Sequence, residues 1–137
     1  MTSENLELRK VGLKITLPRV KIFKLLETMS LQNEHVSAED VYHHLLKRGE
    51  SIGLPTVYRV LAQFESAGLV VRRHLFKGRS VFELASDDHH DHIVCLDSSE
   101  IIEFRDHIIE RRQQEIAQQH NVELVDHTLV LYVRKSN

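Results

Sequence analysis

The chain has 137 residues, of which 42% are hydrophobic and 28% are charged, and its formal net charge at pH 7 is −2. This composition is typical of a soluble globular protein of one or two small domains and excludes an intrinsically disordered chain. The longest apolar runs are too short for a transmembrane helix and the first ten residues lack the apolar core of a secretory signal, so we expect a cytoplasmic protein without a membrane partner.

Charge is unevenly distributed along the chain. Residues 1–84 contain 13 Lys and Arg against 9 Asp and Glu, whereas residues 85–137 contain 5 against 11 and hold six of the ten histidines. The single cysteine, Cys95, excludes an intramolecular disulfide and is consistent with a reducing compartment. A basic first part and an acidic, histidine-rich second part indicate an anionic partner for the one and a cation for the other.

Three amphipathic helices are predicted in the first part of the chain. Apolar residues recur at helical spacing over 17–29, and Thr16 is in position to cap this helix. Ser37 is suited to cap a second helix. A third helix is predicted to begin near Pro55 and to end at Gly68.

The pattern then changes from helix to strand. LVVRRHLF and SVFEL, joined by Lys77-Gly78-Arg79, predict a β-hairpin that completes a winged helix-turn-helix over residues 1–84. A polar stretch at 85–88 is predicted to be a hinge. The elements expected in residues 89–137 are strands at about 92–96 and 100–104, a helix over about 105–119 and a final strand in HTLVLYV. The expected fold class is therefore α+β, a winged helix followed by a small α/β domain.

The third predicted helix carries polar residues that suit the reading of DNA. Tyr58 is suited to pack on a thymine methyl group or to donate to a phosphate, and Arg59 to bind a guanine edge or a phosphate. An ordinary exposed helix surface is the alternative. Basic residues around this helix and in the hairpin favour DNA as the partner. The net charge of residues 1–84, +4 from 13 basic and 9 acidic residues, is modest, which favours paired half-sites bound by two copies. The candidate DNA contacts are Lys14, Arg19, Thr56, Tyr58, Arg59, Arg72 and Lys77.

His89-His90-Asp91-His92 is the densest group of potential metal ligands. Imidazole and carboxylate together suit Zn, Fe, Mn or Co. In an extended chain His90 and His92 point to one face while His89 and Asp91 point to the other, so this segment is able to supply two sites. A polar loop without metal, a non-haem Fe(II) enzyme and a constitutive DNA-binding protein with a structural metal are the alternatives that the motif leaves open.

The chain resembles the Fur family of bacterial metal-dependent repressors nearly from end to end. The motifs that carry the resemblance are GLKITLPRVKIF, HVSAEDVYHHL, IGLPTVYRVLAQFESAGLV, SVFEL, HHDHIVCLD, IIEF and DHTLVLY. The resemblance implies an N-terminal DNA-binding domain and a C-terminal dimerisation and metal-binding domain over 89–137. It also implies that a dimer or tetramer represses iron-acquisition genes from A/T-rich inverted repeats in double-stranded DNA.

The resemblance further implies two sets of metal ligands. Those of a regulatory Fe(II) site, at which Mn(II) or Co(II) would substitute in vitro, are His35, Glu83, His90, His92 and Glu103. Those of a second site, expected to hold Zn(II), are His89, Asp91, Glu110 and His127. The chain departs from the family at Ser98, which replaces the second cysteine of a C-x-x-C pair, so the thiolate zinc site of many members cannot form. Because a domain of about fifty residues buries little core, the second metal and oligomerisation would have to stabilise it.

Overall fold

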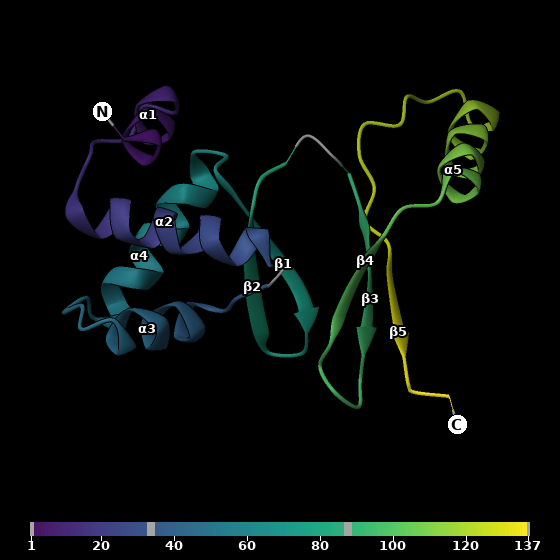
Figure 1. Ribbon diagram of the computed structural model, residues 1–137. Helices are drawn as coiled ribbons and strands as arrows, with labels where there is room; N and C mark the ends of the chain where they lie inside the picture. The colour runs from purple at the N-terminus through teal and green to yellow at the C-terminus, as the bar shows by residue number, and fades with distance from the viewer. Residues whose placement is uncertain (1, 33–34, 87–88, 137) are drawn as a thin grey trace. The chain divides into compact units, whose positions relative to one another are not determined.

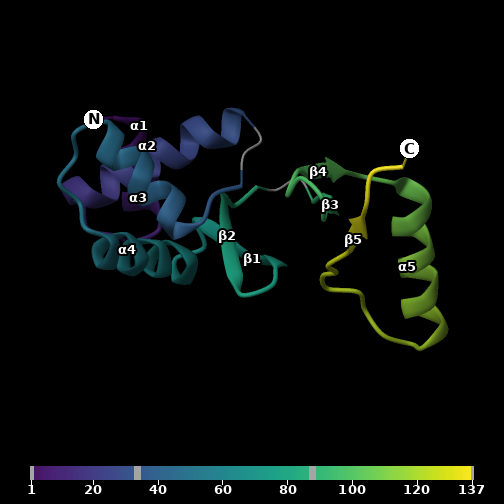
Figure 2. The same ribbon diagram turned by 90° about the horizontal axis from the view of Figure 1, so that it is seen from below.

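The computed structural model describes residues 2–32, 35–86 and 89–136 (Figures 1 and 2). The chain divides into two compact units, residues 1–86 (unit 1) and 87–137 (unit 2). This division falls within the predicted hinge at 85–88, of which residues 87 and 88 lie outside the described residues. Helices combined with small sheets confirm the predicted α+β class. Nowhere in the described ranges is a helix both long and apolar enough to span a membrane.

Unit 1 consists of helices followed by a β-hairpin (Figure 1). Its elements are α1 (Ser3–Lys10), α2 (Leu17–Leu31), α3 (Ala38–Lys47), α4 (Leu54–Ser66), β1 (Val70–Phe76) and β2 (Arg79–Leu84). The predicted helices are α2, α3 and α4, and the predicted hairpin is β1 and β2. Helix α1 was not predicted, because it buries only Leu8 and therefore shows no apolar stripe.

Side-chain caps begin the helices where the sequence predicts them. Thr16 accepts a hydrogen bond from the Arg19 amide at 3.4 Å at the start of α2. At the start of α3, Ser37 and Asp40 form a capping box in which each side chain accepts from the other residue's amide, at 3.1 and 3.0 Å. These contacts satisfy amides that the first helical turn leaves without a backbone partner.

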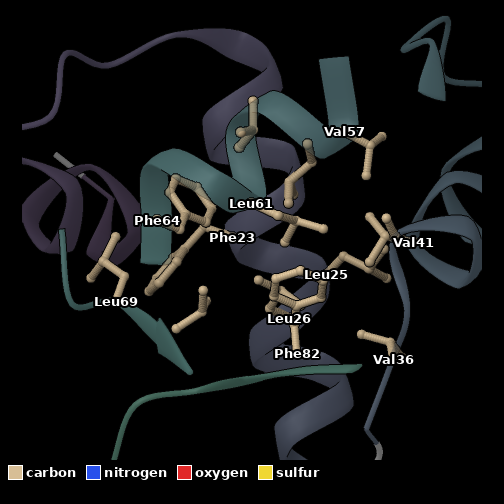
Figure 3. Close-up of a cluster of buried hydrophobic side chains, with 14 of the residues drawn as sticks. Phe23, Leu25, Leu26, Val36, Val41, Val57, Leu61, Phe64, Leu69 and Phe82 are labelled. Carbon is tan, nitrogen blue, oxygen red and sulfur yellow. The ribbon is translucent and has the colours of Figure 1, made fainter. Parts of the chain in front are cut away.

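A cluster of buried apolar side chains joins the helices of unit 1 to its hairpin (Figure 3). Helix α4 contributes Val57, Leu61 and Phe64, which are fully buried. The rings of Phe64 and Phe23 of α2 meet edge to face, with their centroids 6.0 Å apart. Phe82 of β2 belongs to the same cluster. Burial of this face of α4 fixes the helix on the domain and directs its other face outward.

The aromatic pair in this cluster leads to a stability prediction. We expect Phe64→Leu to lower the free energy of urea unfolding by about 1–2 kcal/mol, because it removes ring volume and an edge-to-face contact from a fully buried site. Circular dichroism at 222 nm measures the effect. Leu31→Ala, at an 88% exposed position on α2, is the control and should change stability much less. Equal losses in the two variants would contradict the role of Phe64 in the core.

Unit 2 contains a sheet in the order β4–β3–β5, together with a helix. Its elements are β3 (Asp91–Cys95), β4 (Ile101–Phe104), α5 (His107–Gln119) and β5 (Val130–Val133). Strand β4 pairs antiparallel and β5 parallel to β3. All four elements were predicted, but β5 is shorter than HTLVLYV because its pairing with β3 begins only at Val130. His127 therefore lies in the loop before β5, and strand alternation does not determine its position.

Candidate metal centres and nucleic-acid interface

The first two turns of α4 carry the residues predicted to read DNA. Tyr58 and Arg59 are exposed and Thr56 is half-buried, with Arg59 Nη2 donating to Thr56 Oγ1 at 3.4 Å. The Tyr58 hydroxyl donates to the Glu39 carboxylate of α3. This hydrogen bond is the main cause that raises the pKa of Tyr58 and lowers the pKa of Glu39. Sequence reasoning missed Glu39, because no local pattern relates it to a residue nineteen positions later.

The other predicted DNA contacts have different surroundings. Lys14, between α1 and α2, and Lys77, in the hairpin turn, are exposed. Arg19 is half-buried, and its Nη1 donates a hydrogen bond to the backbone carbonyl of Lys14 at 2.7 Å. Arg72 lies over the Phe82 ring, with its guanidinium carbon 5.2 Å from the ring centroid, and it also pairs with a glutamate of α4 at 3.3 Å. Arg19 and Arg72 are thus engaged within the protein, whereas both lysines extend into solvent.

His35 and Glu83 form a close pair in unit 1. Val36 and Phe82 exchange backbone hydrogen bonds of 3.3 and 2.7 Å in an isolated antiparallel bridge, which brings their neighbours 35 and 83 opposite each other. His35 Nε2 lies 2.7 Å from Glu83 Oε2, and the side chains are only 2% and 12% exposed. An imidazole nitrogen and a carboxylate oxygen in this position suit a first-row divalent metal.

Arg73 of β1 binds the other oxygen of the same carboxylate. Its Nε donates to Glu83 Oε1 at 3.0 Å. The contact requires the two side chains to share a face of the hairpin, and an irregularity between Arg73 and Phe76 decides this. Sequence analysis counted Arg73 only among the basic residues of the hairpin. Strand pairs counted regularly back from Phe76 and Arg79 would place Arg73 on the opposite face from Glu83.

A second histidine and carboxylate group lies in unit 2. His90 Nε2 is 3.3 Å from Glu103 Oε1 of β4, and the rings of His90 and His92 are 4.9 Å apart. His92 pairs directly with Glu103 across the β3–β4 ladder and is 1% exposed. These residues lie on one side of the HHDH segment, as the alternation predicts.

His89, Asp91 and His127 form a separate group in unit 2. Asp91 Oδ1 lies 3.0 Å from His89 Nε2 and 3.2 Å from His127 Nε2, and the two rings are 4.0 Å apart between centroids. One ligand atom from each residue lies within 4.8 Å of the others. Two imidazoles and one carboxylate make a donor set that suits zinc.

Unsatisfied polar atoms also favour a metal in this group. Asp91 is 1% exposed, and its second oxygen, Oδ2, is buried without a hydrogen-bond partner among the described residues. His127 Nε2 is buried too, and its 3.2 Å approach to Asp91 lacks hydrogen-bond geometry. A buried carboxylate is costly unless its charge is compensated, and a bound cation supplies that compensation.

Glu110 lies near this group but is engaged elsewhere. It lines a cavity of about 420 Å³ together with His89 and His127. Its Oε1 accepts from Arg105 Nε at 3.0 Å, and its Oε2 lies 3.7 Å from His107 Nδ1. The structure therefore brings three of the four predicted second-site residues into one ligand group and leaves Glu110 at the wall of the adjoining cavity.

The chain is similar to known ferric uptake regulators over nearly all of its length. Residues 10–132 match the sequence profile of the ferric uptake regulator family. The ferric uptake regulation protein of Pseudomonas aeruginosa is 61% identical over 132 residues, covering 96% of this chain and 97% of that protein.

Two solved structures of such regulators superpose on this chain. The Vibrio cholerae ferric uptake regulator has a TM-score of 0.88 at 53% identity, covering 96% of this chain and 98% of that one. The Pseudomonas aeruginosa regulator solved with manganese has a TM-score of 0.84 at 58% identity, covering 99% and 100%.

Proposed function

Because the chain belongs to the ferric uptake regulator family, we propose that it is an Fe(II)-responsive DNA-binding repressor of iron-acquisition genes. It would act in the cytoplasm as a homodimer or tetramer on A/T-rich inverted repeats. The observation that carries this proposal is the division of the HHDH segment into two ligand groups on a chain whose other unit is a winged helix. This combination suits a regulator that couples a metal to DNA, and the winged helix has no evident role in a metalloenzyme.

The proposed regulatory ligands come from both units. Unit 1 would contribute the His35 and Glu83 pair, and unit 2 would contribute His90, His92 and Glu103. Nitrogen and oxygen donors of this kind suit Fe(II), and they discriminate poorly against Mn(II) or Co(II). When bound, the ion would supply a positive charge to which several of these side chains coordinate at once. Ligands from both units would then restrict the motion of one unit relative to the other, so that metal binding selects one arrangement of the recognition helices.

The proposed second site is structural and holds Zn(II). His89, Asp91 and His127 would supply its first three ligands. The buried Asp91 Oδ2, which has no hydrogen-bond partner in the described part of the chain, supports this assignment. Glu110 would be the fourth ligand and would have to exchange its contact with Arg105 for the metal. Such a site would help to hold unit 2 together in a chain that has no thiolate pair.

Exposed apolar residues in unit 2 support self-association. Ile108 and Ile116 of α5 are 72% and 43% exposed, and Tyr132 of β5 is 53% exposed. A dimer through this unit would bring two winged helices to the two halves of an inverted repeat. The proposed DNA contacts are Lys14, Thr56, Tyr58, Arg59, Arg72 and Lys77, and Arg19 would act beside them through its contacts with Lys14 and α4.

Removal of Arg73 should weaken the regulatory site without removing a ligand. We expect Arg73→Ala to lower Mn(II) affinity at this site about tenfold, because the Arg73 contact at 3.0 Å orients the Glu83 carboxylate. Electron paramagnetic resonance of free Mn(II) measures the affinity. The control is Arg79→Ala, an exposed arginine of the same hairpin that lies over Phe76 and does not contact Glu83. Wild-type affinity in Arg73→Ala would contradict this role.

The function itself is tested by DNA binding. Chelator-treated protein is titrated with Fe(II) under anaerobic conditions and, in parallel, with Zn(II), on a duplex with an A/T-rich inverted repeat and on a scrambled duplex. Specific binding that appears as Fe(II) saturates the protein supports the proposal. Iron-independent binding would make both metals structural, and an absence of specific binding under all conditions would overturn the DNA-binding function.

A further inference from the structure

Arg19 of α2 forms hydrogen bonds both to helix α4 and to the loop between α1 and α2, in which Lys14 lies. Its Nε and Nη2 both donate to Gln63 Oε1 of α4, at 3.2 and 3.0 Å. Its Nη1 donates to the backbone carbonyl of Lys14 at 2.7 Å. The guanidinium group is planar and its N–H directions are fixed, so these three bonds determine where the loop lies relative to Gln63.

Gln63 lies on the face of α4 that carries proposed DNA contacts. It follows Arg59 by four residues and Arg59 follows Thr56 by three, so the three side chains share one helical face. Leu13 lines a cavity of about 480 Å³ together with Arg59 and Gln63. The loop therefore runs beside this face, and the exposed side chain of Lys14 begins next to the residues that would meet DNA.

We propose that Arg19 is a positioning residue for DNA binding, which together with Gln63 holds Lys14 beside α4. This inference rests on the proposed function, since it requires that this face of α4 meet DNA. Three of the five N–H groups of Arg19 are bonded to protein atoms, and its side chain is half-buried. Its positive charge is thus used to fix a neighbouring cation in place, not primarily to contact phosphate.

Loss of the contacts that Arg19 makes with Gln63 and with the Lys14 carbonyl should weaken the contribution of Lys14 to DNA affinity. Lys14 lies between α1 and α2, outside regular secondary structure. Without Arg19 or Gln63, DNA would have to order the loop on binding, and part of the interaction would be lost to that ordering. Each phosphate contact contributes about 0.9 to the slope of log affinity against log salt concentration, so displacement of Lys14 should lower that slope.

The test is DNA affinity over a range of salt concentrations. Full-length, Mn(II)-loaded protein is titrated on a labelled duplex with an A/T-rich inverted repeat, and binding is followed by fluorescence anisotropy. We expect Gln63→Leu to lower affinity about five- to tenfold and to lower the salt slope by about 0.9 for each bound protomer. Gln63→Leu changes no charge, so a lower slope would report the displaced lysine. Arg19→Lys keeps the positive charge but cannot make the three hydrogen bonds of the guanidinium group, so it should behave like Gln63→Leu.

Two further variants distinguish positioning from a direct contact. Lys14→Ala should lower the slope by the same amount, and addition of Gln63→Leu to Lys14→Ala should cause no further loss. Lys24→Ala removes an exposed charge from the same helix as Arg19 and should keep the wild-type slope within error. Circular dichroism establishes that each variant is folded.

The outcomes separate this inference from the function on which it rests. A wild-type slope in Gln63→Leu, or additive losses in the double variant, would overturn the positioning role of Arg19 while leaving the repressor function intact. Retention of full affinity by Arg19→Lys would instead assign Arg19 a direct phosphate contact. Failure of the wild-type protein to prefer the repeat over a scrambled duplex would overturn the proposed function, and this inference with it.

Discussion

In the His90→Ala variant, we expect metal-dependent DNA binding to fall by about 10- to 100-fold. His90 lies 3.3 Å from Glu103 and 4.9 Å, between ring centroids, from His92, so it is central to the unit 2 part of the proposed regulatory site. A coupling of about 1–3 kcal/mol between metal and DNA corresponds to a change of this size in affinity. Anisotropy titrations of the repeat duplex with and without saturating Mn(II) measure the coupling directly.

The reciprocal measurement strengthens this prediction. In the wild-type protein the repeat duplex should raise Mn(II) affinity by the same factor by which Mn(II) raises DNA affinity, and both effects should be lost together in His90→Ala. His120→Ala is the matched control, because His120 is an exposed histidine of unit 2 outside both ligand groups. Wild-type coupling in His90→Ala would remove this residue from the regulatory site.

The second large effect is expected at Asp91, and it should depend on zinc. In the wild-type protein, zinc at about 100 times its dissociation constant should stabilise the folded state by about 2.7 kcal/mol, and Asp91→Asn should lose most of this gain. The reason is that Asp91 supplies the only carboxylate of the group His89, Asp91 and His127, between two imidazoles at 3.0 and 3.2 Å. Thermal unfolding followed by circular dichroism, with EDTA and with added Zn(II), measures the difference.

The same variant should behave differently without metal. In EDTA we expect Asp91→Asn to be about as stable as wild type, since the buried carboxylate, whose Oδ2 has no hydrogen-bond partner among the described residues, carries a desolvation cost that the amide avoids. The control is Asp97→Asn, which replaces an exposed aspartate of the same unit that accepts from the Lys135 amide at 2.9 Å. Equal zinc stabilisation of Asp91→Asn and wild type would exclude Asp91 as a ligand.

The two metal effects separate the two roles proposed for the chain. His90→Ala should impair metal-dependent DNA binding and leave stabilisation by zinc intact. Asp91→Asn should reduce stabilisation by zinc more than it reduces DNA binding. If both variants lost both properties equally, the ligand groups would not act as separate sites. This comparison therefore tests whether alternation along the four-residue HHDH segment creates two centres with different functions.

Much of this protein is determined by local sequence. The apolar stripe of α2, the cap residues Thr16 and Ser37, and the change from helical to strand pattern after Gly68 each depend on a few neighbouring residues. The separation of His90 and His92 from His89 and Asp91 is local as well, because side chains alternate along any extended chain. For these features the sequence alone was sufficient.

Tertiary structure decided which side chains meet when the partners are distant in the chain. The loop at His127 reaches Asp91 although β5 begins only at Val130, and Gln63 meets Arg19 across 44 residues. Neither contact follows from periodicity, because each depends on how separate elements pack.

The β1–β2 hairpin shows most clearly why tertiary structure, and not residue type, decides which side chains meet. Strand pairing counted back from Phe76 and Arg79 at the turn would place Glu83 on the face of Arg72, but the irregularity between Arg73 and Phe76 shifts the register by one residue. Since a shift of one residue reverses every side chain, Glu83 meets Arg73 and Arg72 is left to lie over the Phe82 ring. The residue types were evident from the sequence; which arginine supports Glu83, the proposed metal ligand, was decided by the three-dimensional register.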